Sequence, residues 1–185
     1  MVERRTEALH RDAEGLDTQP PEAILSLLAR GQADAAQSVH AAIPSIASAA
    51  ELIATRLRAG GRVVYAAAGS SGLMALADAL ELPGTFGIAS DRIVVLLAGG
   101  EDALKSLAGA PEDDVAEAET AIADARIGSD DCLIAVSASG STPYAVAALE
   151  AARRRGAATV AIANNPAAPL LEKADISILL ETPPE

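Results

Sequence analysis

The sequence has 185 residues, half of them apolar, a formal net charge of −12 and an aromatic content of 2%. The length suits one domain with a helical extension, whose core needs no metal or disulfide, and the single cysteine, Cys132, excludes a disulfide within the chain. The negative charge opposes binding to nucleic acid. No apolar run reaches the roughly 18 residues of a membrane helix, and no signal peptide is recognisable. We therefore expect a cytoplasmic protein that binds neither nucleic acid nor a membrane.

Residues 1–59 are predicted to form an N-terminal helical arm. Pro20-Pro21-Glu22 resembles a helix start, and residues 33–42 give a second helical stretch. Pro44 is expected to begin a third helix, in which apolar residues recur at spacings of three and four. Gly60-Gly61 ends the arm, which we expect to pack against a sheet or against a second subunit.

From residue 60 to residue 185, strand and helix patterns alternate. The candidate strands are 62–67, 93–97, 132–137, 158–163 and 175–180, and the candidate helices are 72–81, 101–108, 113–125, 142–155 and 167–173. This alternation predicts an α/β domain with a doubly wound, five-stranded parallel sheet covered on both faces. Ligands of such sheets bind at the carboxyl edge, near the switch in strand order.

Two stretches lead from a predicted strand into a predicted helix through small residues and hydroxyls. The first is Gly69-Ser70-Ser71-Gly72, and the second is Ser137-Ala138-Ser139-Gly140-Ser141-Thr142. Glycine lets the backbone approach a ligand closely, and the N–H groups of a helix N-terminus attract anions. An ordinary turn explains one such loop, whereas two in one domain indicate a phosphate site. Neither matches a Walker or a GxGxxG pattern.

Two acidic positions are candidates for proton transfer. Glu81 is predicted to end the helix that begins near Leu73, because Leu82-Pro83 should break it. A carboxylate is unfavourable at a helix C-terminus, so Glu81 is either a solvated helix end or an acid/base group. Glu112 follows Pro111 ahead of a helix, where capping explains an acid on spacing alone. His10 and His40 lack metal-ligand partners, so they are expected at the surface, and no metal site is expected.

Further motifs occur together with the two hydroxyl stretches. They are Gly60-Gly61-Arg62-Val63-Val64-Tyr65, Asp78-Ala79-Leu80-Glu81-Leu82-Pro83-Gly84-Thr85-Phe86, Ala98-Gly99-Gly100 and Pro143-Tyr144, with Thr6-Glu7 and Leu16-Asp17 near the start. In this combination the chain resembles the N-acetylmuramic acid 6-phosphate etherase family, from about residue 6 to residue 185. The hydroxyl stretches alone indicate only the wider sugar isomerase (SIS) domain superfamily.

The resemblance implies a cofactor-free carbon–oxygen lyase of amino-sugar catabolism. Such an enzyme cleaves the D-lactyl ether of N-acetylmuramic acid 6-phosphate, giving N-acetylglucosamine 6-phosphate and D-lactate. By motif position, Glu81 matches the family's principal acid/base glutamate and Glu112 a second glutamate near the site. Ser70, Ser71, Ser139 and Thr142 match the phosphate-binding hydroxyls, and Gly69, Gly72, Ser137, Gly140 and Ser141 complete the expected phosphate-binding set.

The chain departs from the family's pattern at several places, among them Gly109-Ala110-Pro111-Glu112-Asp113, where the family has Glu-Gly-Ala-Glu-Asp. Leu73 and Ser141 stand where the family usually has arginine, and the family continues beyond Glu185, so we expect a shortened and divergent member. Glu81 favours catalysis, whereas the missing arginines favour an alternative function, a non-catalytic regulatory domain that binds a sugar phosphate. The apolar face of the arm predicts a homodimer, because exposed apolar surface tends to be covered by a partner.

Overall fold

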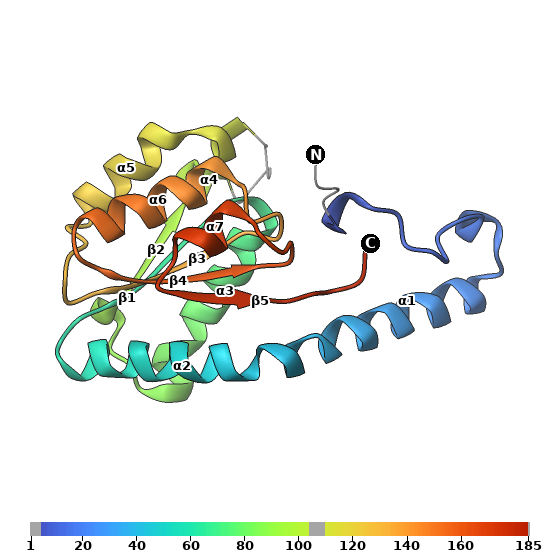
Figure 1. Ribbon diagram of the computed structural model, residues 1–185, viewed down its shortest axis with the longest axis horizontal. Coiled ribbons are helices and arrows are strands. Elements are labelled where there is room, and N and C mark those ends of the chain that lie inside the picture. Colours follow the sequence, from blue (N-terminus) through green and yellow to red (C-terminus); the bar gives the residue numbers. More distant parts are fainter. Residues whose placement is uncertain (1–4, 104–109, 185) are drawn as a thin grey trace.

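A five-stranded, all-parallel sheet forms the centre of the computed structural model, which describes residues 5–103 and 110–184 (Figure 1). Its strands are β1 (Val63–Ala67), β2 (Ile93–Leu97), β3 (Cys132–Val136), β4 (Ala158–Ala163) and β5 (Ile176–Leu179). Their order in the sheet is β2-β1-β3-β4-β5. The direction of winding reverses between β1 and β3, so the predicted doubly wound sheet is confirmed, with its switch point at these two strands.

Helices cover both faces of this sheet (Figure 1). One face is covered by α5 (Val115–Asp124), α6 (Pro143–Arg154) and α7 (Pro169–Lys173), and the other by α2 (Val39–Arg58) and α3 (Gly69–Phe86). Alanine dominates the buried side of α6 and recurs on α2 and α3, and its small side chain lets a helix lie close to the strands. No helix within the described ranges is long and apolar enough to cross a membrane.

The N-terminal arm consists of α1 (Pro21–Gln37) and α2, which follow one another with a single residue between them. The expectation that Pro44 begins a helix is wrong, because Pro44 lies inside α2. A proline removes one helical hydrogen bond, but Ala42 and Ala49 are buried against the sheet on either side of it and hold the helix together. The division of the chain at residues 59 and 60 stays a prediction.

The helix predicted over 72–81 extends beyond both ends. α3 begins at Gly69, so the first hydroxyl stretch is its first turn, and it continues through Pro83 to Phe86. Gly87, with φ of 68°, caps the helix in the left-handed conformation that commonly ends helices. Of the helix expected over 101–108, α4 (Gly100–Ala103) is described, and the remainder of that prediction falls on residues 104–109, outside the described part of the chain.

A buried ion pair closes the opposite, amino edge of the sheet. Asp131, which precedes β3, has a side chain only 7% exposed and accepts hydrogen bonds from the Arg62 guanidinium at 2.8 and 3.0 Å. It also accepts from the backbone N–H groups of Arg62 and Gly128. The same guanidinium donates to the carbonyls of Ala125 and Arg126, so it ties the end of α5 to the start of β1.

Candidate functional site

The two hydroxyl stretches meet at the switch point of the sheet. β1 and β3 are hydrogen-bonded neighbours, and Ala67 pairs in register with Val136. The residues that follow the two strands, Ala68 and Ser137, therefore lie at the same height along the sheet, on strands about 4.8 Å apart. The expectation that both stretches lie at one carboxyl edge is confirmed.

The first stretch presents the N-terminus of α3 to this edge. Its N-cap residue, Ala68, makes no side-chain hydrogen bond to the first turn, so the N–H groups there face outward with the positive end of the helix dipole. Ser70 is exposed and Ser71 is half-buried. Gly72 is buried, and a Cβ at that position would lie 3.1 Å from Leu97 Cδ2, so glycine keeps the helix close to β2.

The second stretch is a hydrogen-bonded cluster of hydroxyls centred on the buried Ser137. Ser137 Oγ lies 2.8 Å from Thr142 Oγ1 and 3.2 Å from Ser139 Oγ, and it accepts from the N–H of Gly140 at 3.1 Å. Ser139 Oγ accepts from the N–H and the hydroxyl of Ser141, both at 3.2 Å. The structure thus brings all the predicted residues of this stretch together ahead of α6.

Gly140 is fixed in place by backbone geometry and by close packing. Its φ of 66° lies in the left-handed region, and a Cβ there would fall 2.4 Å from Ala168 Cβ and 2.9 Å from Ala163 Cβ. Both neighbours are themselves buried, so a side chain would displace the whole turn. The hydroxyl cluster is therefore held rigidly before any ligand arrives.

Asn165 ties this cluster to the N-terminal segment, a contact that the sequence analysis missed. Its buried amide donates to the carbonyl of Ser139 at 3.1 Å and to Thr6 Oγ1 at 2.9 Å, and its Oδ1 accepts from the N–H of Thr6 at 3.3 Å. Thr6 and Asn165 are 159 positions apart, so no local sequence pattern marks this pair.

Glu81 does not join the hydroxyl stretches within one chain. The expectation that it ends a helix is wrong, because α3 continues for five more residues. It lies twelve residues after Gly69, which at a rise of 1.5 Å per residue puts it about 18 Å along the helix axis from the site. Its exposed carboxylate accepts a hydrogen bond from Thr85 Oγ1 at 3.1 Å.

Glu112 lies on the same side of the molecule as the second hydroxyl stretch. It belongs to a 3₁₀ turn, Ala110–Asp113, that packs against α6, and its side chain is exposed. The sequence favoured helix capping as the role of this acidic stretch. Asp114 is the residue that caps α5, since its Oδ1 accepts a hydrogen bond from the N–H of Glu117 at 2.8 Å. Helix capping therefore does not explain the acidic side chain of Glu112.

A further carboxylate at this edge, Glu117, was missed by the sequence analysis. Both of its oxygens accept from the N–H of Gly99, at 2.9 and 3.1 Å, where the chain leaves β2. Burial, together with the negative charge of Glu117, raises the pKa of the Tyr144 hydroxyl to about 12. The pattern Asp-x-x-Glu over 114–117 predicts a bond from Glu117 back to the N–H of its own N-cap residue, so it gives no indication of the contact with Gly99, 18 positions away.

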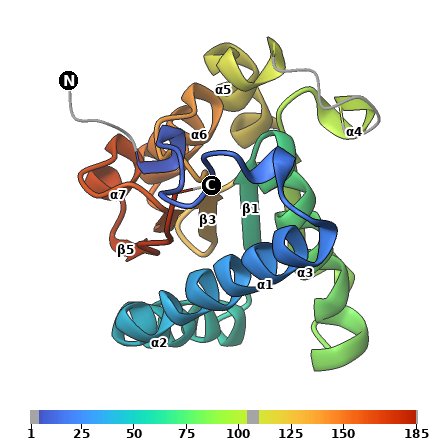
Figure 2. The same cartoon turned by 90° about the vertical axis from the view of Figure 1, so that its right-hand side faces the viewer.

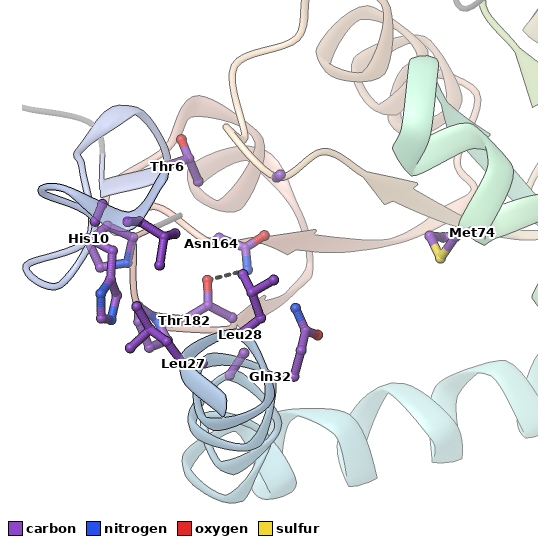
Figure 3. Close-up of a pocket in the computed structure, with 15 residues that line it drawn as sticks. Thr6, His10, Leu27, Leu28, Gln32, Met74, Asn164 and Thr182 are labelled. Carbon is purple, nitrogen blue, oxygen red and sulfur yellow. Dashed lines mark hydrogen bonds between the residues drawn. The ribbon is translucent and has the colours of Figure 1, made fainter. Parts of the chain in front are cut away.

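A cavity of about 730 Å³ lies beside the second hydroxyl stretch. The N-terminal segment, α1 and the C-terminal segment all extend beyond the carboxyl edge of the sheet (Figure 1 and Figure 2). The cavity is lined by Thr6, His10, Ala13, Leu16, Leu27, Leu28, Gly31, Gln32, Ala35, Met74, Ala138, Asn164, Thr182, Pro183 and Pro184. Figure 3 shows Leu28 of α1 beside Asn164 and Thr182, and His10, expected at the surface without a role, is half-buried in the wall.

Metal-ligating side chains do not gather at this edge. Across residues 5–103 and 110–184, no group of three or more His, Cys, Asp or Glu residues could hold a metal ion. The groups that can meet a ligand here are hydroxyls, backbone N–H groups and carboxylates.

Comparison with known proteins supports a common fold and family. The SIS domain model matches residues 29–164. An N-acetylmuramic acid 6-phosphate etherase from Deinococcus radiodurans is 46% identical over 182 residues, which cover 98% of this chain and 60% of the relative. The chain therefore spans about six tenths of the length of that relative.

Solved structures with the same fold include an isomerase and a protein complexed with ManNAc-6P. A phosphoheptose isomerase from Francisella tularensis superimposes with a TM-score of 0.67 at 22% identity, covering 86% of this chain and 84% of its own. The Vibrio vulnificus NanR protein complexed with ManNAc-6P gives a TM-score of 0.52 at 16% identity, covering 91% and 54%. The resemblance to N-acetylmuramic acid 6-phosphate etherases is thus confirmed at the level of sequence, and the chain belongs to the SIS domain family.

Proposed function

We propose that the carboxyl edge of the sheet binds the phosphate of a sugar 6-phosphate. The observation that carries the proposal is the pair of hydroxyl stretches on either side of the β1/β3 switch point, each leading into a helix N-terminus. Neither stretch contains Lys or Arg, so the dianion would be held by N–H groups, hydroxyls and two helix dipoles. Because no cation contributes, we expect weak binding.

The reaction that we propose is cleavage of a lactyl ether of the bound sugar, by analogy with the etherase from Deinococcus radiodurans. In the ring-opened sugar, the aldehyde at C1 acidifies the C2 hydrogen, and a carboxylate removes it as a general base. The electron pair forms the C2–C3 double bond while the C3–O bond breaks, and lactate leaves after protonation. Water then adds across the same double bond.

Glu81 is the proposed acid/base group, and we propose that it acts across a subunit interface. About 18 Å of helix separates it from the hydroxyl stretches of its own chain, and Leu80 and Phe86 beside it are each 70% exposed. A second subunit packed on this face would bring its Glu81 to the first subunit's site. Glu112, exposed on the turn next to α6, is proposed as the second carboxyl group.

A regulatory domain that binds a sugar phosphate without turnover is the second candidate. Leu73 and Ser141 supply no charge where etherases usually have arginine, and the NanR protein, which shares the fold, is complexed with ManNAc-6P. Incubation of the purified chain with N-acetylmuramic acid 6-phosphate separates the two candidates. Release of D-lactate supports the lyase, and thermal stabilisation without lactate supports the regulator.

Sugar 6-phosphates should stabilise the chain through the two hydroxyl stretches. A ligand at one hundred times its dissociation constant adds about 2.7 kcal/mol to the free energy of unfolding. The double variant Ser71→Ala/Ser139→Ala should lose most of the rise in melting temperature caused by N-acetylglucosamine 6-phosphate. Ser48→Ala, on the exposed side of α2, is the matched control and should keep the rise. An unchanged rise in the double variant would place the ligand elsewhere.

A homodimer is the expected state in solution. An apolar stripe lies on the exposed side of α2, formed by Val39, Ile43 and Ile46, and an exposed apolar surface of this kind marks an interaction site. Light scattering at micromolar concentration should report a dimer. Ile43→Lys/Ile46→Lys should give a folded monomer, since both positions are exposed. A monodisperse monomer of the unaltered chain would contradict the expectation.

A further inference from the structure

The cavity beside the second hydroxyl stretch has an unsuitable lining for an unsubstituted sugar. Leucine, methionine, proline and alanine side chains supply most of its wall. A sugar ring carries a hydroxyl on nearly every carbon. Moving a hydroxyl from water into an apolar wall without a hydrogen-bond partner costs about 2–7 kcal/mol of free energy. An apolar group, in contrast, gains free energy from the same wall.

Apart from Gln32, the polar side chains of the wall bond to the protein itself. Asn164 donates its amide to Thr182 Oγ1 at 3.0 Å and to the carbonyl of Leu180 at 3.2 Å (Figure 3). Thr6 is paired with Asn165 through two hydrogen bonds, and His10 Nδ1 accepts from the N–H of Asp12. These contacts rigidify the wall, and they leave apolar contact as the main attraction that the cavity offers to a ligand.

The cavity adjoins the proposed phosphate site. Ala138, which lines it, lies between the hydroxyl residues Ser137 and Ser139, and its carbonyl accepts from the N–H of Asn164 at 2.9 Å. Met74, in the second turn of α3, lines it from the side of the first hydroxyl stretch. One ligand can therefore place its phosphate at the hydroxyls and a substituent in the cavity. The volume, about 730 Å³, lies within the range of sites for whole drug-sized molecules and exceeds what an acetyl group fills.

We propose that the cavity binds the apolar acyl chain of an N-acylated amino sugar 6-phosphate, and that it accepts chains longer than acetyl. The proposal rests on the proposed phosphate site and adds the class of ligand. The N-terminal segment forms one wall of this subsite, and Asn165 holds it there, since its amide bonds both Thr6 and the Ser139 carbonyl. Chain length should then control affinity, because each methylene buried in such a wall contributes about 0.8 kcal/mol, or about fourfold in affinity.

The test compares N-acetyl-, N-butanoyl- and N-hexanoyl-glucosamine 6-phosphate by calorimetry on the full chain. We expect affinity to rise along the series, with the hexanoyl compound binding at least tenfold more tightly than the acetyl compound. Leu28→Gln should reduce this ratio several-fold and leave the affinity for the acetyl compound nearly unchanged. Leu25→Gln is the matched control, because Leu25 lies on the same helix, is 65% exposed against 53% for Leu28, and does not line the cavity.

A second pair of variants repeats the comparison on another wall. Met74→Gln should reduce the ratio of hexanoyl to acetyl affinity, and Ala77→Gln, at an exposed position of the same helix α3 outside the cavity, should not. Equal affinity for all three compounds in the unaltered chain overturns the acyl subsite and leaves the phosphate site standing. Equal losses in Leu28→Gln and Leu25→Gln also overturn it. Failure of all three compounds to bind overturns the proposed function together with the subsite.

Discussion

Replacement of Asp131 by alanine is expected to lower the free energy of unfolding by about 3–5 kcal/mol, the usual loss when one partner of a buried ion pair is removed. The variant leaves the Arg62 guanidinium, whose side chain is 27% exposed, without its carboxylate. It also leaves the backbone N–H groups of Arg62 and Gly128 without their acceptor. Urea unfolding followed by circular dichroism measures the change.

Asp130→Ala is the matched control for this variant. Asp130 is the exposed neighbour of Asp131, and a surface substitution of this kind usually changes stability by less than about 0.5 kcal/mol. A loss below about 1 kcal/mol in Asp131→Ala would show that the ion pair contributes little. The expected difference between the two variants therefore depends on burial and hydrogen bonding, not on net charge, which changes equally in both.

The stabilisation by Asp131 should also depend on pH. Burial alone would raise the pKa of this carboxyl, but the hydrogen bonds from Arg62 and Gly128 outweigh burial and hold the pKa below its ordinary value of 3.8. The group therefore contributes its full stability above that ordinary value, and the contribution is lost as the pH falls through the lowered pKa. The stability difference between the unaltered chain and Asp131→Ala should accordingly be constant near neutrality and shrink only in strong acid.

Most of the sheet could be predicted from the sequence because β1, β2 and β3 are continuous apolar runs, and β4 and β5 are each interrupted by a single hydroxyl residue. Val63–Ala67 and Cys132–Val136 are almost entirely buried, and this is the pattern of a parallel strand covered on both faces. Two of the errors in helix bounds came from proline. Pro44 and Pro83 lie inside helices, because one missing hydrogen bond is outweighed by alanines packed on the sheet, an effect of tertiary packing that local sequence does not report.

The two hydroxyl stretches could be predicted for a different reason. Each is continuous in sequence, and right-handed crossovers require both to emerge at the same edge. The contacts that complete the site join distant segments instead. Gly99 donates its N–H to Glu117, 18 positions further along the sequence, and Thr6 bonds Asn165, 159 positions away. Periodicity and motif spacing describe near neighbours only, so neither the carboxylate at Gly99 nor the apolar cavity was visible in the sequence.

Glu81→Gln is expected to reduce lactate release from N-acetylmuramic acid 6-phosphate by about 10²- to 10⁴-fold, the range that general acid–base catalysis usually contributes. Glutamine keeps the size and hydrogen bonding of the side chain but cannot shuttle a proton. Since Glu81 lies far along α3 from the hydroxyl stretches, the rise in melting temperature caused by N-acetylglucosamine 6-phosphate should persist. Release of lactate at the unaltered rate would refute the assignment.

Mixing two defective chains tests whether Glu81 acts across a subunit interface. Glu81→Gln lacks the proposed acid/base group, and Ser71→Ala/Ser139→Ala lacks the phosphate contacts. If each site combines the hydroxyls of one subunit with Glu81 of the other, a mixed dimer contains one intact site and one doubly defective site. Since half of the dimers in an equal, fully exchanged mixture are mixed and the interface has two-fold symmetry, about a quarter of the unaltered activity should return. If Glu81 served its own chain, no mixed dimer would contain an intact site, and the absence of any recovery would reject the shared site.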